Sequence, residues 1–290
     1  MLEHLNAAPM QPARAVVMGA AGFVGGAIAA RLERDGVRVL RLARADIDLL
    51  APDAGKRLGA LLEPGDVFVA VSAMAPCKNA EMLVQNLVIA RALAQAIESV
   101  NLSHVVNIGS DAVYADSPAP LTESSCASPD SLHGVMHLAR EVVLRSAAKA
   151  PFATLRPTLV YGAADPHNGY GPNRFRRLAA KGEDIVLFGA GEERRDHVFV
   201  DDVAELAARI VLRRSRGVLN AATGVVHSFR EIADKVVHLS GRVVAIRETP
   251  RSGPMPHNGY RPFDPSGCRA AFPDFRFTPL DRGLQLAAQA

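Results

Sequence analysis

The sequence predicts an α/β fold, a doubly wound parallel sheet that carries a second, smaller C-terminal lobe. Short apolar runs that are typical of buried strands alternate with longer amphipathic runs that are typical of helices. This alternation favours parallel strands joined by helical crossovers. The chain of 290 residues is 49% hydrophobic and 22% charged, the composition of an ordinary globular protein with a large core.

The first strand is expected over residues 14–18, "RAVVM". A helix follows over residues 27–35 and ends at Gly36, because glycine is the common residue just after a helix. The run "VRVLRLA" at residues 37–43 predicts the second strand. These three elements make one strand–helix–strand unit.

The same alternation continues through the middle of the chain. Apolar runs predict strands over residues 66–74, 104–110 and 152–162. Amphipathic runs predict helices over residues 81–100 and 132–148. In a parallel sheet the carboxyl ends of the strands form the ligand-binding edge, so we expect the site there.

The turn between the first strand and the first helix reads "GAAGFVG". Glycine at positions 19, 22 and 25 allows a tight turn, close approach of the backbone to a pyrophosphate, and close packing of helix on strand. A glycine-rich packing turn is the alternative, but the position between a strand and a helix makes the motif specific. We predict a dinucleotide site that includes Gly19, Gly22, Phe23, Val24 and Gly25.

The end of the second strand favours NADP over NAD as the cofactor. Sites for NAD place an acid near this point, where it binds the ribose 2′-hydroxyl, but residues 42–44 read "LAR". Arg41 or Arg44 can pair with a 2′-phosphate, unless both are only solvated charges. Asp46 and Ile47 follow closely enough to line an adenine pocket.

Composition also excludes several classes of partner. The three cysteines have no CxxC spacing, which argues against a disulfide framework or structural zinc and favours the cytoplasm. The net charge of +3 is carried by scattered arginines, which favours a local anion site over a nucleic-acid surface. The apolar run at residues 15–30 is too short to span a membrane.

Several longer motifs resemble the extended short-chain dehydrogenase/reductase family, the NAD(P)-dependent nucleotide-sugar epimerases, dehydratases and 4-keto reductases. The resemblance covers nearly the whole chain. Its motifs are GxxGxxG in the glycine turn, Asn86, "GSDAVY" at 109–114, "PLTESSCASPDSLHG" at 120–134, "LRPTLVYG" at 155–162, and the block at 173–205.

The resemblance implies a Rossmann-type cofactor domain made of residues 1–162 and 196–226. It implies a nucleotide-sugar lobe made of residues 163–195 and 227–290. The implied partner is a nucleotide-diphosphate sugar, and a second copy of the chain in a homodimer is also considered.

The resemblance also implies roles for single residues. Ala73 and Asn86 would contact the cofactor. The implied substrate residues are Ser110, Asp111, Asn173 and Arg195, of which Asn173 and Arg195 would hold the diphosphate. An arginine suits that task, because its planar fork donates two charge-assisted hydrogen bonds to phosphate oxygens.

The active helix of the family carries Tyr-x-x-x-Lys, and this chain has His133 and His137 in those places. A free tyrosine titrates near pH 10 and needs a cationic neighbour to ionise, whereas an imidazole titrates near 6.5 without such help. We therefore expect three catalytic residues. Ser110 polarises the substrate oxygen, His133 relays the proton, and His137 donates a hydrogen bond to the nicotinamide ribose.

Two other interpretations of the histidines remain. Histidines at i and i+4 can chelate a metal, but the glutamate of HExxH and a third ligand are missing, so no metal is predicted. In the second interpretation, the chain has lost the redox chemistry and is a catalytically silent nucleotide-binding protein. The favoured function is an NADP-dependent epimerase or 4-keto reductase that acts at C4 of a nucleotide-diphosphate sugar.

Overall fold

The computed structural model describes residues 2–289. Its centre is a six-stranded sheet in the order β2-β1-β3-β4-β5-β9, and every neighbouring pair in it is parallel. The strands are β1 (Ala15–Met18), β2 (Val39–Leu42), β3 (Val67–Ala70), β4 (His104–Ile108), β5 (Phe152–Pro157) and β9 (Gly217–Ala221). The doubly wound α/β prediction is confirmed. The order reverses between β1 and β3, the place where such sheets bind ligands.

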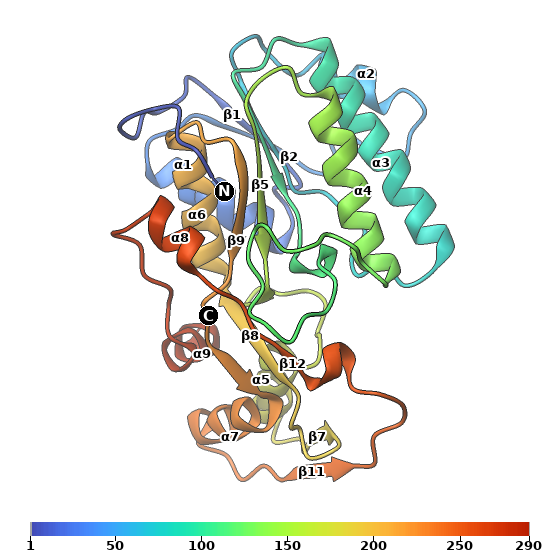
Figure 1. The fold of residues 1–290 in the computed structure, drawn as a ribbon, viewed down its shortest axis with the longest axis vertical. Helices are drawn as coiled ribbons and strands as arrows, with labels where there is room; N and C mark the ends of the chain where they lie inside the picture. Colours follow the sequence, from blue (N-terminus) through green and yellow to red (C-terminus); the bar gives the residue numbers. More distant parts are fainter. Residues whose placement is uncertain (1, 290) are drawn as a thin grey trace.

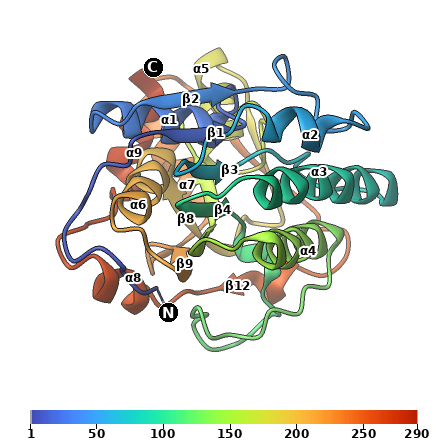
Figure 2. The same cartoon turned by 90° about the horizontal axis from the view of Figure 1, so that it is seen from above.

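Helices cover both faces of this sheet (Figure 2). One face carries α1 (Phe23–Arg34) and α6 (Val200–Leu212), which pack on each other. The other face carries α2 (Ala54–Gly59), α3 (Ala80–Ser99) and α4 (Leu132–Ala147). Each helix layer buries its own apolar cluster against the sheet, so the sheet is covered on both sides as a parallel sheet requires.

A second group of elements forms a lobe below the carboxyl ends of the sheet strands (Figure 1). Its strands are β6 (Leu159–Tyr161), β8 (Arg194–Phe199), β10 (Val226–Ser228) and β12 (Tyr260–Arg261) in one sheet, with β7 (Ile185–Phe188) and β11 (Ile246–Thr249) in another. Its helices are α5 (Pro172–Lys181), α7 (Phe229–Ser240) and α9 (Leu280–Gln289). Two short 3-10 turns, η1 (Asp111–Val113) and η2 (Pro256–Gly259), complete the elements that matter for the site.

The last helices connect the two parts of the molecule. Helix α8 (Ser266–Ala271) returns to the main sheet and contacts β9, and α9 then packs on α7 and β8. The domain boundaries expected at residues 162, 195 and 226 stay a prediction. The contact of α8 with β9 shows that part of the expected lobe lies against the sheet.

Two predicted elements differ from the observed ones in an informative way. The first helix begins at Phe23 instead of residue 27, because the backbone is already helical through Gly25 and Gly26. The strand predicted over residues 152–162 divides into β5 and β6 at Thr158. The Thr158 N–H still bonds to the edge of β9, while its hydroxyl donates to Asp196 of β8, so the chain changes sheets there.

A buried polar network fixes α4 against the sheet. Glu141 of α4 forms an ion pair with Arg156 of β5, with 2.8 Å between Oε1 and Nη2. Arg156 also donates to the Tyr114 hydroxyl at 2.8 Å, and that hydroxyl donates to Asn220 of β9 at 2.7 Å. The network joins α4, β5, β9 and the chain after η1, and so fixes α4 against the sheet.

We expect Glu141→Gln to lower the free energy of unfolding by about 3 kcal/mol, because it leaves the buried Arg156 guanidinium without its carboxylate. Urea denaturation of the full chain measures the change. The matched control is Glu98→Gln, at an exposed position of the neighbouring helix α3. A loss for Glu141→Gln no larger than that of the control would contradict a structural role for the ion pair.

Candidate active site

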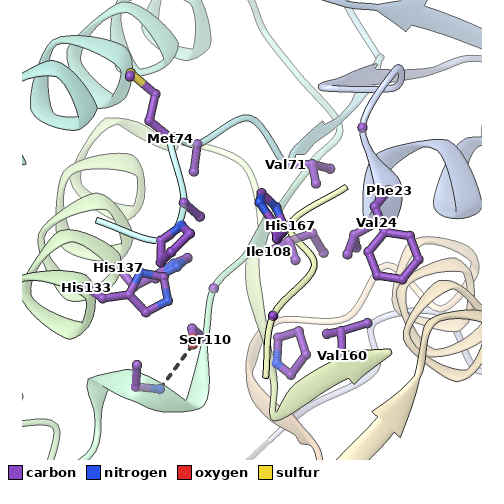
Figure 3. Close-up of a pocket in the computed structure, with 18 of the residues that line it drawn as sticks. Phe23, Val24, Val71, Met74, Ile108, Ser110, His133, His137, Val160 and His167 are labelled. Carbon is purple, nitrogen blue, oxygen red and sulfur yellow. Dashed lines mark hydrogen bonds between the residues drawn. The ribbon is translucent and has the colours of Figure 1, made fainter. Parts of the chain in front are cut away.

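A single cavity of about 1030 Å³ lies between the carboxyl ends of the sheet strands and the lobe. It runs from the glycine turn before α1, past the loop after β3 and the start of α4, to β6, β8 and η2 of the lobe. Figure 3 shows part of it, with Phe23 and Val24 on one side and the two histidines of α4 on the other. Its volume suits a cofactor and a substrate that meet inside it.

The glycine turn leaves room only for backbone. Gly19 has φ 104°, and a Cβ on it would lie 2.9 Å from the backbone nitrogen of Ser72. A Cβ on Gly25 would lie 2.1 Å from the carbonyl oxygen of Gly19. Gly22 is the N-cap of α1 and provides no side-chain cap, so the first N–H groups of the helix are available to an anion. This cradle fits the pyrophosphate of a dinucleotide, and the five predicted turn residues, Gly19 and Gly22 to Gly25, all line the cavity.

The residues predicted around the adenosine end fall into two groups. Arg44 and Ile47 line the cavity. Arg41 does not line it and instead donates two hydrogen bonds to Glu33, at 2.8 and 2.6 Å. Asp46 also lies outside the lining, and its carboxylate accepts from the Ala43 N–H. The roles of Arg41 and Asp46 at the cofactor stay predictions, with Arg44 the better placed arginine.

Sequence reasoning missed the residues that follow directly, Asp48, Leu49 and Leu50, which line the cavity beside Ile47. The sequence contained a signal for these residues, because the apolar pair at positions 49 and 50 belongs to the same turn after β2 as Ile47.

The loop after β3 carries Ala73, which lines the cavity, and its contact with a cofactor stays a prediction. Asn86 of α3 is buried outside the lining. Its side-chain amide donates to the Met74 carbonyl oxygen at 3.0 Å, and its Oδ1 accepts from the Met74 N–H at 2.9 Å. In this structure Asn86 therefore braces the loop that forms the cavity wall, and its contact with a cofactor stays a prediction.

His133 and His137 lie on the same face of α4, one turn apart, with ring centroids 4.7 Å apart at right angles. The helix begins at Ser131, whose side chain accepts from the Gly134 N–H and fixes where the turn starts. Both rings line the cavity, and Figure 3 shows them side by side with Ser110 below them. The spacing of four residues on a helix thus places both rings on the cavity wall.

Burial favours the neutral form of both imidazoles. Burial lowers the pKa of His133 below its ordinary value, although the Asp111 carboxylate acts in the opposite direction. Burial holds the pKa of His137 well below its ordinary value, and the neighbouring His133 and Arg140 add to the effect. His133 Nδ1 accepts a hydrogen bond from the Cys77 N–H at 3.3 Å, whereas His137 Nδ1 is buried and has no partner among the described residues.

Arg140 places a fixed positive charge next to His137, and sequence reasoning missed it. Its guanidinium is completely buried and donates to the carbonyl oxygens of Ala70 and Val71, at 2.7 and 3.4 Å. Burial lowers its pKa to about 10, so the group stays charged at pH 7. Among residues 2–289 it has no carboxylate partner. The available signal was its spacing, three residues after His137 on the same helix.

Ser110 and Asp111 begin η1, directly after β4, and both line the cavity. The Ser110 hydroxyl oxygen accepts from the Ala112 N–H at 3.1 Å, the contact marked in Figure 3. Asp111 is buried and pairs with Arg261 of β12, with 3.2 Å between Oδ2 and Nε. A lobe residue therefore holds the backbone that follows Ser110.

The lobe contributes Asn173 and Arg195 to the cavity, and their role at a diphosphate stays a prediction. Asn173 Oδ1 accepts from the Gly162 N–H at 3.1 Å, which fixes the start of α5. Arg195 is mostly buried and pairs with Glu193 at 3.3 Å. His197 lines the same wall because alternate residues of β8 face the same side, a signal that the sequence contained. Its Nε2 is buried and has no partner among the described residues.

Sequence reasoning also missed Asp116 and His257, which line the cavity from opposite parts of the molecule. Asp116 Oδ1 lies 2.5 Å from His257 Nδ1 and 2.6 Å from Arg261 Nη1. The two partners are separated by 141 residues, so no local pattern could reveal the pair.

Residues 2–289 lack two further features. No three side chains of histidine, cysteine, aspartate or glutamate gather in the arrangement that a metal ion needs. No helix combines the length and the apolar character that crossing a membrane requires.

Comparison with known protein families gives one match of high coverage. Residues 15–222 match the family described as "NAD dependent epimerase/dehydratase family". That range includes the glycine turn, the histidines of α4 and Arg195.

Two characterised relatives illustrate the similarity. The chain is 26% identical to GDP-L-fucose synthase of Escherichia coli, over 84% of this chain and 88% of that protein. It is 29% identical to UDP-glucose 4-epimerase of Mycolicibacterium smegmatis, over 76% of this chain and 80% of that protein.

Solved structures share the fold at lower identity. The UDP-glucose 4-epimerase of Thermotoga maritima with UDP-glucose has a TM-score of 0.84 and 20% identity, covering 95% of this chain and 97% of that one. A GDP-L-fucose synthetase of Naegleria fowleri bound to NADP has a TM-score of 0.83 and 15% identity, covering 99% and 96%. These structures show that the sheet and the lobe are arranged alike.

Proposed function

Because the chain belongs to the NAD-dependent epimerase/dehydratase family, we propose that it is an NAD(P)-dependent oxidoreductase that acts at C4 of a nucleotide-diphosphate sugar. One observation carries the proposal. The same cavity joins a glycine cradle that fits a dinucleotide to a lobe wall that carries Arg195, with Ser110 and His133 between them. Both epimerisation and 4-keto reduction agree with this arrangement.

The bound nicotinamide cofactor accepts or supplies the hydride in this reaction. Side chains of the protein polarise the reacting oxygen, transfer the proton and hold the cofactor. Ser110 and His133 face the reacting oxygen and polarise it, and His133 is the group that we expect to relay the proton. His137 contacts the nicotinamide ribose as a neutral hydrogen-bonding partner, because its pKa lies well below the ordinary value. A neutral His137 carries no positive charge, and the nearby Arg140 provides a fixed one.

The proposed cofactor is NADP, held at its 2′-phosphate mainly by Arg44. The motivation is the missing acid after β2 and the position of Arg44 in the cavity lining. Changing Arg41 and Arg44 together to alanine should lower NADPH affinity about tenfold or more and leave NADH affinity unchanged, because a charge-assisted pair is lost. Calorimetric titration with both nucleotides measures this, with Arg38→Ala as the matched control. Equal affinity of the unmodified protein for NADPH and NADH would contradict the assignment.

The proposed substrate residues on the lobe are Asn173 and Arg195, with Asp111 at the sugar. Arg195→Ala should weaken binding of a nucleoside diphosphate by about 2 kcal/mol, the scale of a lost charge-assisted hydrogen bond. Titration with UDP, GDP and dTDP measures the change. Arg194→Ala, which alters the half-exposed neighbour, should leave binding unchanged. If Arg195→Ala binds nucleoside diphosphates as tightly as the unmodified protein does, the diphosphate does not bind at this wall. If NADPH affinity falls together with nucleoside-diphosphate affinity, the variant is misfolded.

We also propose a cytoplasmic location, because of the cysteine pattern.

We further propose a homodimer in which α3 and α4 pair with the same helices of a second copy. These adjacent helices expose Val84, Leu87, Leu132, Val135 and Val142. Val84→Asp with Val142→Asp should yield a monomer in sedimentation experiments at micromolar concentration, because burying a carboxylate in an apolar interface is costly. Val186→Asp, at an exposed position of the lobe, should leave the dimer intact. A monomeric unmodified protein would refute the proposal.

Turnover tests the function itself. The unmodified protein should act on UDP-glucose with NADP⁺, or on a dTDP-4-dehydro-6-deoxy sugar with NADPH, and His133→Ala should abolish turnover while the cofactor still binds. His137→Ala should chiefly weaken binding of the cofactor. The informative control is the double change His133→Tyr with His137→Lys. Activity that arises only in this double variant would mean that the natural chain is a silent binding protein.

A further inference from the structure

Five histidines line the cavity, and His257 is one that the proposed mechanism does not use. His257 lies in η2 with φ 53°, and Asn258 beside it has φ 52°. Two successive non-glycine residues in the left-handed region are strained, and such strain persists where surrounding contacts hold the backbone. Here the contact is with Asp116, whose Oδ1 lies 2.5 Å from His257 Nδ1. The fold therefore holds this imidazole in one orientation at the cavity wall.

The hydrogen bonds of His257 determine which ring nitrogen carries the proton. An ionised carboxylate only accepts hydrogen bonds, so Nδ1 is protonated where it meets Asp116. Arg261 Nη1 also lies 3.0 Å from Nδ1, but it donates to the same carboxylate oxygen at 2.6 Å, so two N–H groups meet at that oxygen. A neutral His257 thus has its lone pair on Nε2, and Nε2 makes no hydrogen bond with any residue that the structure describes. That is the arrangement of a general base oriented by a carboxylate.

His133 has the opposite arrangement. Its Nδ1 accepts from the Cys77 N–H, so the neutral ring carries its proton on Nε2. His133 can donate this proton in a hydrogen bond, but its release would leave an anionic imidazolate. The cavity therefore contains one imidazole that is set to donate and one that is set to accept.

We propose that His257, oriented by Asp116, takes the proton-relay role that the proposed function gave to His133. His257 exchanges the proton with the reacting oxygen of the sugar, while His133 holds that oxygen with its Nε2–H. The inference rests on the proposed function. In the reductive direction a hydride from the reduced nicotinamide, which would become oxidised, would form the new C4–H bond, and the carbonyl π pair would move onto O4. O4 then takes the Nε2 proton of the His257 imidazolium, which becomes a neutral ring that keeps its Nδ1 proton on Asp116. The oxidative direction reverses each step.

The charges that face His257 connect this role to substrate binding. Burial lowers its pKa most, Arg195 of β8 and Arg261 of β12 lower it further, and Asp116 raises it, so the net shift is downward. Asp111 lies beyond Arg261 and pairs with its guanidinium. A diphosphate bound at Arg195 would offset the charge of that arginine, so the pKa of His257 should rise on binding. The reduction rate should then fall as pH increases through the pKa of the complex, because the imidazolium is the proton donor.

Nitrogen-15 NMR of the full chain with labelled histidines tests the protonation pattern without turnover. The probe is UDP, GDP or dTDP, whichever the unmodified protein binds, and His257→Gln and His133→Gln assign the signals. We expect the Nδ1–H form for His257, the Nε2–H form for His133, and a rise of about one unit in the pKa of His257 on binding the probe. An Nε2–H form of neutral His257, or a pKa that does not rise in the complex, overturns the inference.

Turnover separates the inference from the proposed function. His257→Gln should lower turnover about 100-fold or more with nucleotide affinity unchanged, because a proton-transfer group is lost. Asp116→Asn should also lower turnover and shift its pH profile. His238→Gln, the same change at an exposed position of α7, should have no effect. Turnover of His257→Gln within about threefold of the unmodified protein overturns the inference alone. If the unmodified protein turns over no nucleotide sugar, the proposed function fails, and the NMR result decides the inference.

Discussion

The ion pair between Glu141 and Arg156 is the interaction on which the arrangement of the site depends. It is buried, and Tyr114 and Asn220 extend it to the chain after η1 and to β9. Through it, one helix, two strands and the segment after Ser110 keep a common position. A buried pair of this kind is weak evidence for added stability, but its hydrogen-bond geometry specifies how the elements meet. The consequence is a helix N-terminus that holds two imidazoles over the strand ends.

Burial determines the chemistry that these imidazoles can perform. It lowers the pKa of both, and it leaves the neighbouring Arg140 as the charged group. A Tyr and Lys pair depends on the lysine charge to ionise the tyrosine, whereas neutral histidines need no such partner. In this chain the fixed positive charge beside the imidazoles is Arg140, three residues after His137 on the same helix.

Local patterns in the sequence predicted the parallel sheet, the glycine cradle and the shared face of His133 and His137, because each depends on short-range spacing. Arg41 and Asp46 were chosen by position along the chain, but their side chains bind Glu33 and the Ala43 N–H instead of lining the cavity. The pair of Asp116 and His257 could not be predicted, since only the tertiary fold brings residues so distant in sequence together. Arg140 was missed because a buried cation without a carboxylate violates the usual expectation for arginine.

The path of the last residues has a consequence for how the protein is made. Helix α8 contributes Cys268 to the apolar cluster on one face of the sheet, and α9 contributes Leu280 and Leu284 to the cluster of the lobe. Neither cluster is complete while these residues are still inside the ribosome. We therefore expect a growing chain to remain open to proteases until residues 266–289 have left the ribosome, which digestion of ribosome-bound chains of increasing length would show or refute. The sheet and the lobe would then pack around the cavity together, once α8 and α9 have emerged.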